Sequence, residues 1–298
     1  MSQPDLLNRP RRSMLYMPGD KAKVLEKGKN LAADSLIIDL EDAVAPAAKS
    51  EARSQACAAV KAGGYGHREL ILRMNGLDTE WGAADLQAIS EAAPNGILVP
   101  KVDSGADVVQ IDQALDAAGA AKTLALWVMI ETPLSILNIQ NIAAAATQTR
   151  LTGFVLGTND LAKAYRAQMT PDRFAFQTSL SLALIAARAF NLMAIDGVYN
   201  DIQNIEGFQA ECQQGQIFGF DGKTLIHPSQ LEVANHIFSP KPEDIDQAKA
   251  IIEAFESPEN AGKGVLKVNG KMAELLHLED ARRTLSVHGA IMAMKDGV

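Results

Sequence analysis

Short apolar runs recur along the chain at nearly constant spacing and alternate with alanine-rich stretches of helical periodicity. Eight runs predict β-strands at 13–19, 34–41, 69–76, 96–102, 124–132, 152–160, 192–199 and 221–228. Most are continuously apolar, which is typical of parallel strands buried on both faces. The stretches between them predict helices at 21–33, 46–62, 81–93, 105–118, 133–146, 173–190 and 202–214.

Repeated βα units form either an open doubly wound sheet or a closed (β/α)₈ TIM barrel. Polar residues recur at the ends of the predicted strands, in steps of 31, 28, 30, 29, 36 and 31 residues. They are Asp42, Arg73, Lys101, Glu131, Asp160, Asp196 and His227. A step of one βα unit places them around one rim, and the C-terminal rim of a barrel carries the active site. No glycine-rich nucleotide-binding pattern follows a predicted strand, so we favour the barrel.

The periodicity changes after residue 240. A helix is predicted at 243–255, a loop rich in Gly, Pro and Asn at 257–270, and a further helix at 272–294. We therefore expect a catalytic barrel at 1–240 and a C-terminal helical extension at 241–298, which either packs under the barrel or reaches a neighbouring subunit.

Composition narrows the class of protein. A length of 298 residues with 47% hydrophobic residues suits one large barrel core, and a net charge of −8 argues against a nucleic-acid partner. No apolar run is long enough to span a membrane. Residues 1–5 lack the apolar stretch of an export signal, and Cys57 and Cys212 suit reduced thiols, so we expect a cytoplasmic protein.

Basic residues cluster around the first predicted strand despite this acidity. They are Arg9, Arg11 and Arg12 before it, and Lys21, Lys23, Lys27 and Lys29 after it. Such clusters are usually solvated, but they can also bind an anionic ligand with several phosphates.

Glu131 and Asp160 are the candidate metal ligands, because they end neighbouring predicted strands that lie ~4.8 Å apart. Two hard carboxylates that leave other positions to water or substrate are typical of Mg²⁺. The alternative is that either acid caps the following helix, which suits Asp160 better than Glu131.

Charged residues at the other strand ends have open roles. Asp39, Glu41 and Asp42 need solvent, a partner or a cation, and could hold metal-bound waters or orient a base. Arg73 could stabilise an enolate or pair with these acids.

Lys101 could form a Schiff base or an ion pair, and we favour the ion pair because nearby carboxylates raise a lysine pKa. His227 could be an acid or base, or a structural group that ties the last strand to its helix, and we favour the structural role.

Together these segments resemble the citrate lyase β-subunit/malyl-CoA lyase family within the HpcH/HpaI aldolase superfamily. The matching segments are 14–20, 39–44, 73–75, 99–102, 130–132, 159–161 and 222–230, in order over nearly the whole chain. The resemblance implies Mg²⁺, for which Mn²⁺ can substitute, bound by Glu131 and Asp160. It also implies that Arg73 contacts the substrate and that coenzyme A binds near Tyr16, Lys21 and Lys27.

The same resemblance implies a base in the C-terminal extension. Family members often carry Gly-x-Met-x-Asp there and reach a neighbouring subunit's site, whereas this chain has Glu274 in place of the aspartate. The longer side chain could weaken lyase chemistry and leave thioester hydrolysis, unless Glu279 or Asp280 serves instead. We expect a homo-oligomer, a trimer or a hexamer.

We therefore predict a Mg²⁺-dependent lyase that cleaves a 3-hydroxyacyl-CoA such as malyl-CoA or citramalyl-CoA into an acyl-CoA and a 2-oxo acid. Glu41, Asp42, Arg73 and Glu274 are the catalytic candidates; Tyr16, Lys21, Lys27, Arg73, Lys101 and Glu131 are the substrate-binding candidates. The alternatives are a (3S)-malyl-CoA thioesterase, a citrate lyase β-subunit that acts on a carrier-bound thioester, and a non-catalytic barrel.

Overall fold

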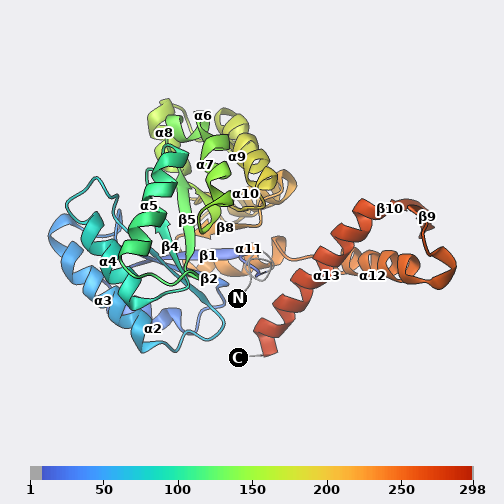
Figure 1. The fold of residues 1–298 in the computed structure, drawn as a ribbon, viewed down its shortest axis with the longest axis horizontal. Helices are drawn as coiled ribbons and strands as arrows, with labels where there is room; N and C mark the ends of the chain where they lie inside the picture. Colours follow the sequence, from blue (N-terminus) through green and yellow to red (C-terminus); the bar gives the residue numbers. More distant parts are fainter. Residues whose placement is uncertain (1–8, 297–298) are drawn as a thin grey trace. The chain divides into compact units, whose positions relative to one another are not determined.

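The computed structural model describes residues 9–296. The stretch 1–5, on which the expectation about export depends, lies outside this range. Eight parallel strands pair in chain order, and the last pairs with the first, so the predicted TIM barrel is confirmed (Figure 1). The strands are β1 (Ser13–Pro18), β2 (Ser35–Asp39), β3 (Glu69–Arg73), β4 (Gly96–Val99), β5 (Ala125–Ile130), β6 (Leu151–Leu156), β7 (Met193–Asp196) and β8 (Gly222–Leu225).

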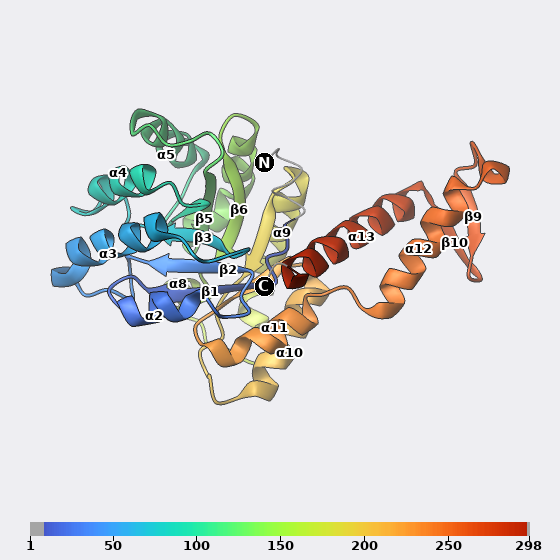
Figure 2. The same cartoon turned by 90° about the horizontal axis from the view of Figure 1, so that it is seen from below.

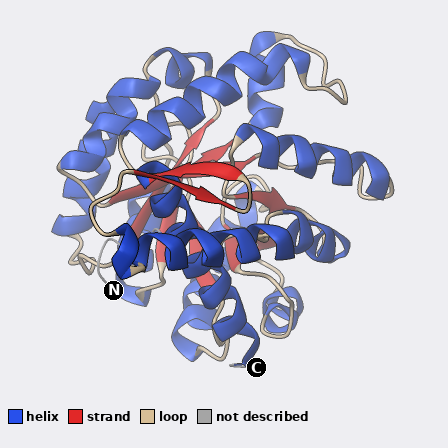
Figure 3. Ribbon diagram, turned by 90° about the vertical axis from the view of Figure 1, so that its right-hand side faces the viewer, coloured by secondary structure: helices blue, strands red, loops and turns tan. Residues whose placement is uncertain are grey.

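Helices surround these strands (Figure 3). They are α2 (Ala22–Gly28), α3 (Lys49–Ala62), α4 (Gly82–Ala92), α5 (Gly105–Ala117), α6 (Pro133–Leu137), α7 (Ile139–Ala144), α8 (Thr158–Tyr165), α9 (Gln177–Ala189), α10 (Ile205–Phe218) and α11 (Leu231–Ile237). Short 3₁₀ turns are η1 (Pro46–Ala48), η2 (Ala145–Thr147), η3 (Phe174–Phe176) and η4 (Pro228–Gln230). Within the described residues, no helix has the length and apolar character needed to cross a membrane.

The barrel interior carries buried charges at the N-terminal ends of the strands. Arg11 donates to Glu69 at 2.7 and 2.8 Å and lies 4.9 Å from the ring centre of Trp127, which is fully buried. Arg12 pairs with Asp34 at 2.7 Å. Both guanidinium groups are buried at the end of the barrel opposite the expected active site, so these two arginines do not form a phosphate-binding surface.

Several predicted boundaries differ from the structure. β6 ends at Leu156, so Asp160 does not end a strand but is the third residue of α8, a helix that the sequence analysis did not predict. The helix α11 was also not predicted, and the helix expected at 133–146 is divided into α6, α7 and η2. The loop expected at 257–270 contains a strand, Val265–Val268.

The described residues divide into two compact units, one of residues 11–238 and one that contains residues 239–296. The second unit contains α12 (Pro242–Glu256), η5 (Pro258–Asn260), β9 (Val265–Val268), β10 (Lys271–Glu274) and α13 (Leu275–Asp296). α12 and α13 lie side by side, and the antiparallel hairpin β9–β10 joins them at one end (Figure 2). The predicted helical extension therefore includes a hairpin, and Glu274 ends a strand and not a helical turn. A separate apolar cluster holds this unit together, formed by Ala248, Ile251, Leu266, Val268, Ala273 and Ala281.

Candidate active site

The C-terminal ends of the strands bring polar side chains from several βα units to one rim. Arg73 is the last residue of β3, and Glu131 directly follows β5. Lys101 lies two residues beyond β4, and Asp160 lies in the first turn of α8. This is the rim at which the repeated spacing in the sequence places an active site.

Arg73 contacts three carboxylates at this rim. Its Nε and Nη2 donate to the two oxygens of Asp39 at 2.7 and 2.6 Å, a bidentate pair between neighbours in the β2–β3 register. Its Nη1 lies 2.8 Å from Glu41 and 3.5 Å from the mostly exposed Asp42. The Asp39 carboxylate also accepts the backbone N–H groups of Glu41 and Ala43 at 2.9 and 3.0 Å. Asp39 therefore fixes both the arginine and the loop that carries the other two acids.

Tyr16, from β1, packs against the guanidinium group. The Arg73 Cζ lies 4.9 Å from the centre of the Tyr16 ring, a cation–π contact. Burial raises the pKa of the Tyr16 phenol, although Arg73 opposes the shift. The phenol is therefore neutral at physiological pH and can act as a hydrogen-bond donor beside the arginine.

Glu41 has the environment of a proton acceptor that works near neutral pH. Burial raises the pKa of its carboxyl to about 7, although the positive charge of Arg73 opposes the shift. The carboxylates that add to the shift are Asp42, Glu131 and Asp39. Among the described residues, Glu41 Oε2 is buried without a hydrogen-bond partner, although it lies close to Arg73. A general base is most effective when its pKa lies near the working pH.

Two residues that the sequence analysis missed hold the backbone of the Glu41 loop. The buried Lys49 donates to the carbonyl oxygens of Leu40 and Glu41 at 2.9 and 2.7 Å, and its Nζ lies 5.3 Å from the ring centre of Trp81. Asn75 donates to the same Leu40 carbonyl at 3.0 Å. Burial lowers the pKa of Lys49, against the pull of the nearby carboxylates. Lys49 begins an amphipathic helix, where a lysine is normally exposed, so its sequence position gave no signal.

Lys101 connects the two candidate metal ligands. Its Nζ lies 2.5 Å from Asp160 Oδ1 and 3.3 Å from Glu131 Oε1, and its backbone N–H donates to that Glu131 oxygen at 2.8 Å. Burial lowers the pKa of Lys101, but the contacts with Asp160 and Glu131 outweigh burial and raise it. A Schiff-base lysine must be neutral to attack a carbonyl, so this environment favours the ion pair.

Glu131 is a buried carboxylate with little spare room. Burial raises its pKa, although Lys101 opposes the shift. A Cβ at Gly157 would lie 2.4 Å from the Glu131 Cβ and 2.6 Å from its Oε2, so only glycine leaves this carboxylate its place.

The donor chemistry at the rim fits a hard divalent cation. Two cations, Arg73 and Lys101, face five carboxylates: Asp39, Glu41, Asp42, Glu131 and Asp160. Within residues 9–296 no group of three or more His, Cys, Asp or Glu side chains is arranged to hold a metal. A cation at Glu131 and Asp160 would therefore have two protein ligands and would take the others from water or substrate, as Mg²⁺ commonly does.

Two predicted rim residues serve the structure instead. Asp196, at the end of β7, is fully buried and pairs with Arg173 at 2.7 Å and with Lys223 at 3.1 Å. His227 begins η4, where its Nδ1 lies 2.8 Å from the Ser229 hydroxyl and accepts the Ser229 backbone N–H at 3.2 Å. Neither residue has a contact with the Arg73 or Lys101 groups among those described.

The remaining candidates lie on exposed surface. Lys21 precedes α2 and pairs with Asp20 at 2.9 Å, whereas Lys27 lies in the last turn of α2, about 9 Å further along the helix axis. Glu274, in the C-terminal unit, is exposed, and its backbone N–H donates to His277 Nδ1 at 2.9 Å. The roles of these three in coenzyme A binding and catalysis stay predictions.

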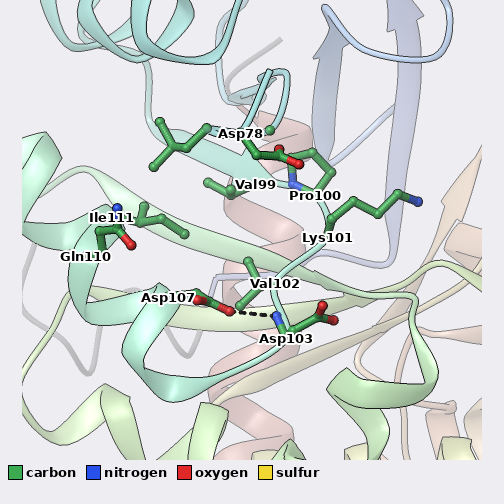
Figure 4. A pocket seen from close by; sticks show the side chains of 11 residues that line it. Asp78, Val99, Pro100, Lys101, Val102, Asp103, Asp107, Gln110 and Ile111 are labelled. Carbon is green, nitrogen blue, oxygen red and sulfur yellow. Dashed lines mark hydrogen bonds between the residues drawn. The ribbon is translucent and has the colours of Figure 1, made fainter. Parts of the chain in front are cut away.

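A cavity of about 370 Å³ borders the Lys101 segment. The loop after β4 forms one wall, and α5 and the loop after β3 form the others (Figure 4). Asp107 accepts the Asp103 backbone N–H at 3.0 Å and so fixes the loop, while the Lys101 side chain points away from Gln110 and Ile111 (Figure 4). The volume lies at the lower end of the range for small-molecule pockets.

The chain is similar in sequence and in fold to proteins of known activity. The chain is 50% identical to a (3S)-malyl-CoA thioesterase of Cereibacter sphaeroides over 286 residues, which cover 96% of this chain and 97% of the relative. It is 35% identical to the citrate lyase subunit beta of Escherichia coli, with 93% of each chain covered. The structure matches that of the protein CitE from Mycobacterium tuberculosis in complex with magnesium, acetoacetate and coenzyme A. That match has a TM-score of 0.75 and 27% identity, and it covers 95% of this chain and 99% of the other.

The family comparison covers most of the barrel. Residues 12–228 match the family described as HpcH/HpaI aldolase/citrate lyase, a span that begins just before β1 and ends just after β8. Curated relatives in this family act as lyase subunits and as a thioesterase, so the chain is an enzyme. It belongs to the HpcH/HpaI aldolase/citrate lyase family.

Proposed function

We propose that this enzyme uses Mg²⁺ to act on a 3-hydroxyacyl-CoA thioester of the malyl-CoA type. The observation that carries the proposal is the rim at which a carboxylate pair suited to a metal lies beside an arginine and a glutamate whose pKa is raised to about 7. The CitE structure that resembles this chain contains magnesium, acetoacetate and coenzyme A, which supports the same ligand classes here.

Hydrolysis of the thioester is the main reaction in this proposal. Its support is the 50% identity to a (3S)-malyl-CoA thioesterase over nearly the full length, against 35% to a citrate lyase subunit beta. Lyase activity, which the sequence analysis places first, is the second candidate. The aldolase and lyase character of the family supports it.

Glu131 and Asp160 would hold the Mg²⁺, and Mn²⁺ would substitute. The bound cation supplies Lewis-acid polarisation of substrate oxygens. Tyr16, Lys21 and Lys27 would contact coenzyme A, with the two exposed lysines near its phosphates.

Glu41 and Arg73 would perform the hydrolytic step between them. Glu41 takes a proton from water as the water oxygen bonds to the thioester carbon, and Arg73 donates hydrogen bonds to the carbonyl oxygen as it gains negative charge. The carbon–sulfur bond then breaks, and the proton passes from Glu41 to the departing thiolate. The products are the free hydroxy acid and coenzyme A thiol.

In the lyase alternative, the same groups act on a carbon–carbon bond. Glu41 would take the proton of the 3-hydroxyl group, and Arg73 would stabilise the enolate oxygen that forms on the thioester. The proton that Glu41 takes would then pass by way of Glu274 to the enolate carbon. The products are a shorter acyl-CoA and a 2-oxo acid, and no free thiol forms.

The products therefore distinguish the two reactions. Purified protein incubated with malyl-CoA or citramalyl-CoA should release free thiol faster than glyoxylate or pyruvate. EDTA should abolish the reaction, Mg²⁺ or Mn²⁺ should restore it, and Glu131→Ala and Asp160→Ala should be inactive but folded. Release of 2-oxo acid without thiol would make the lyase the main activity. Full activity in EDTA would contradict the metal assignment.

A further inference from the structure

Lys101 contacts both of the carboxylates, Glu131 and Asp160, that are the candidate metal ligands. The ammonium group lies 2.5 Å from Asp160 and 3.3 Å from Glu131, so it contacts both carboxylates at once. A divalent cation and an ammonium group cannot both lie in contact with the same oxygens without strong mutual repulsion. Only one of the two, the metal or the Lys101 ammonium group, can therefore contact these oxygens at a time.

The backbone holds Lys101 in this position. The φ of Lys101 is 55°, in the left-handed region. Lysine rarely adopts this region, because a lysine side chain, unlike that of Asn or Asp, cannot stabilise it by a hydrogen bond to the adjacent backbone. In this conformation the backbone N–H donates to Glu131 Oε1 at 2.8 Å. Residues held in such a conformation cluster at functional sites. The backbone and the side chain of one residue are thus both directed at the same carboxylate.

The structure also leaves space for the Lys101 side chain away from the two carboxylates. It is 42% exposed, and the cavity of about 370 Å³ borders the same segment (Figure 4). The ammonium group can therefore leave the two carboxylates while the backbone N–H stays on Glu131. Glu131 cannot move toward Gly157, because the space between them has no room for even a methyl group.

We propose that Lys101 is an internal cation that competes with the divalent metal for Glu131 and Asp160, and that its side chain turns toward the cavity when the metal binds. The inference rests on the proposed function, since it takes these two acids as the metal ligands. Lys101 neutralises part of the repulsion between them before the metal arrives. The same contact lowers the affinity for the metal, because the ion pairs with Lys101 must break first.

Metal binding measures this competition without reference to activity. Free Mn²⁺ is titrated with the full chain at fixed ionic strength and followed by its electron paramagnetic resonance signal. Lys101→Met keeps the apolar stem and removes the charge, so it should bind Mn²⁺ about tenfold more tightly, which corresponds to about 1.4 kcal/mol. Lys101→Arg keeps the charge and should bind no more tightly than the wild type. Lys122→Met, which removes an exposed lysine paired with Asp116 at 2.6 Å, is the matched control and should not change the affinity.

The outcomes separate this inference from the proposed function. Equal or weaker Mn²⁺ binding by a folded Lys101→Met would overturn the competition, while saturable binding by the wild type would leave the metal assignment intact. Saturable binding by neither protein would overturn both. The double variant Lys101→Met/Glu131→Ala should lose the tight Mn²⁺ binding, which would place the bound ion at Glu131. Circular dichroism checks folding, and Lys101→Gln replaces Lys101→Met if the latter does not fold.

Discussion

Arg73 is surrounded by acids to a degree that a purely structural arginine does not need. Its bidentate pair with Asp39 already satisfies one charge, yet Glu41 and Asp42 lie on the same guanidinium group. Burial of the Glu41 carboxyl, together with repulsion from the neighbouring carboxylates, raises its pKa to about 7. The arginine is thus held rigidly by one acid while another stays free to exchange a proton.

The raised pKa of Glu41 gives a prediction about pH. If the ionised carboxylate is the base, kcat/KM should rise with pH through about 7 and then level off. Glu41→Gln should lower kcat by roughly 10²- to 10⁴-fold and remove that limb of the profile. Steady-state kinetics between pH 5.5 and 8.5, ~1.5 units either side of 7, measures both effects. A limb near pH 7 that persists in Glu41→Gln would assign the titration to another group.

The stability of the protein should respond to Glu41 in the opposite sense. The folded state raises the pKa of this carboxyl from 4.5 to about 7, so within that window the folded protein binds more protons than the unfolded chain. The contribution of Glu41 to the free energy of unfolding therefore falls as pH rises from about 4.5 to about 7. Ionisation of Glu41 therefore lowers the free energy of unfolding, although it produces the carboxylate that acts as the base.

Individual residues mark how far the sequence could predict this site. The spacing of polar residues placed Arg73, Glu131 and Lys101 at one rim, because strand ends in a barrel meet there. It could not give the bidentate contact of Asp39, since three neighbouring acids were equally good partners. The role of Lys49 could not be predicted from the sequence, because its burial depends on the tertiary packing of α3 against the Glu41 loop.

At the scale of elements, four charged residues join the outer shell of the barrel to its strands. Lys223, on β8, is fully buried and lies 2.6 Å from Glu211 of α10 and 3.1 Å from Asp196 of β7. Arg173, in the connection between α8 and α9, completes the group. Burial lowers the pKa of Lys223, but Asp196 and Glu211 outweigh it and raise the pKa, so the lysine stays charged.

Removal of this charge should destabilise the barrel. Lys223→Met leaves the buried Asp196 and Glu211 without their shared lysine, and breaking a buried pair in this way costs about 3–5 kcal/mol of unfolding free energy. The control Lys122→Met removes an exposed pair and should cost less than ~1 kcal/mol. Urea denaturation of the two variants measures the difference. Equal unfolding free energies for the two variants would mean that Arg173 compensates for the loss of the lysine charge.

Elements were predicted best where burial on both sides makes a strand continuously apolar. Most of the barrel strands satisfied this condition, although β8, with Lys223 and Thr224, did not. The predicted strand ends were extended too far because polar residues of the rim follow directly. The hairpin β9–β10 was missed because its strands are four residues long and largely exposed. Asn269-Gly270, both with positive φ at its turn, was the available signal, since this dipeptide favours tight hairpin turns.

At the scale of the whole molecule, the C-terminal unit has its own core and is not needed to close the barrel. Several of its apolar side chains are exposed, among them Val265, Met272, Leu275 and Leu276. Its carboxylate Glu274 is the candidate base that the family resemblance implies. We retain the proposal that the protein is a trimer or a hexamer in which this unit reaches a neighbouring subunit.

A shared site predicts complementation between inactive subunits. Glu274→Ala should suppress carbon–carbon cleavage more than metal binding, and Asp160→Ala should remove metal binding. Mixed oligomers of the two should regain part of the lyase activity, because some interfaces combine an intact metal site with an intact Glu274. Product assays after verified subunit exchange measure the recovery. No recovery would place Glu274 in the site of its own subunit or outside catalysis.

The division of the chain into two units also has an optical consequence. Trp81 and Trp127 are its only tryptophans, and both belong to residues 11–238. Intrinsic fluorescence excited at the indole band therefore reports the barrel alone, whereas far-ultraviolet circular dichroism records α12 and α13 as well. If the melting curves from fluorescence and from circular dichroism coincide, the protein unfolds as one cooperative unit. If they separate, the C-terminal unit melts by itself. The molecule thus carries a built-in spectroscopic label in one of its two units.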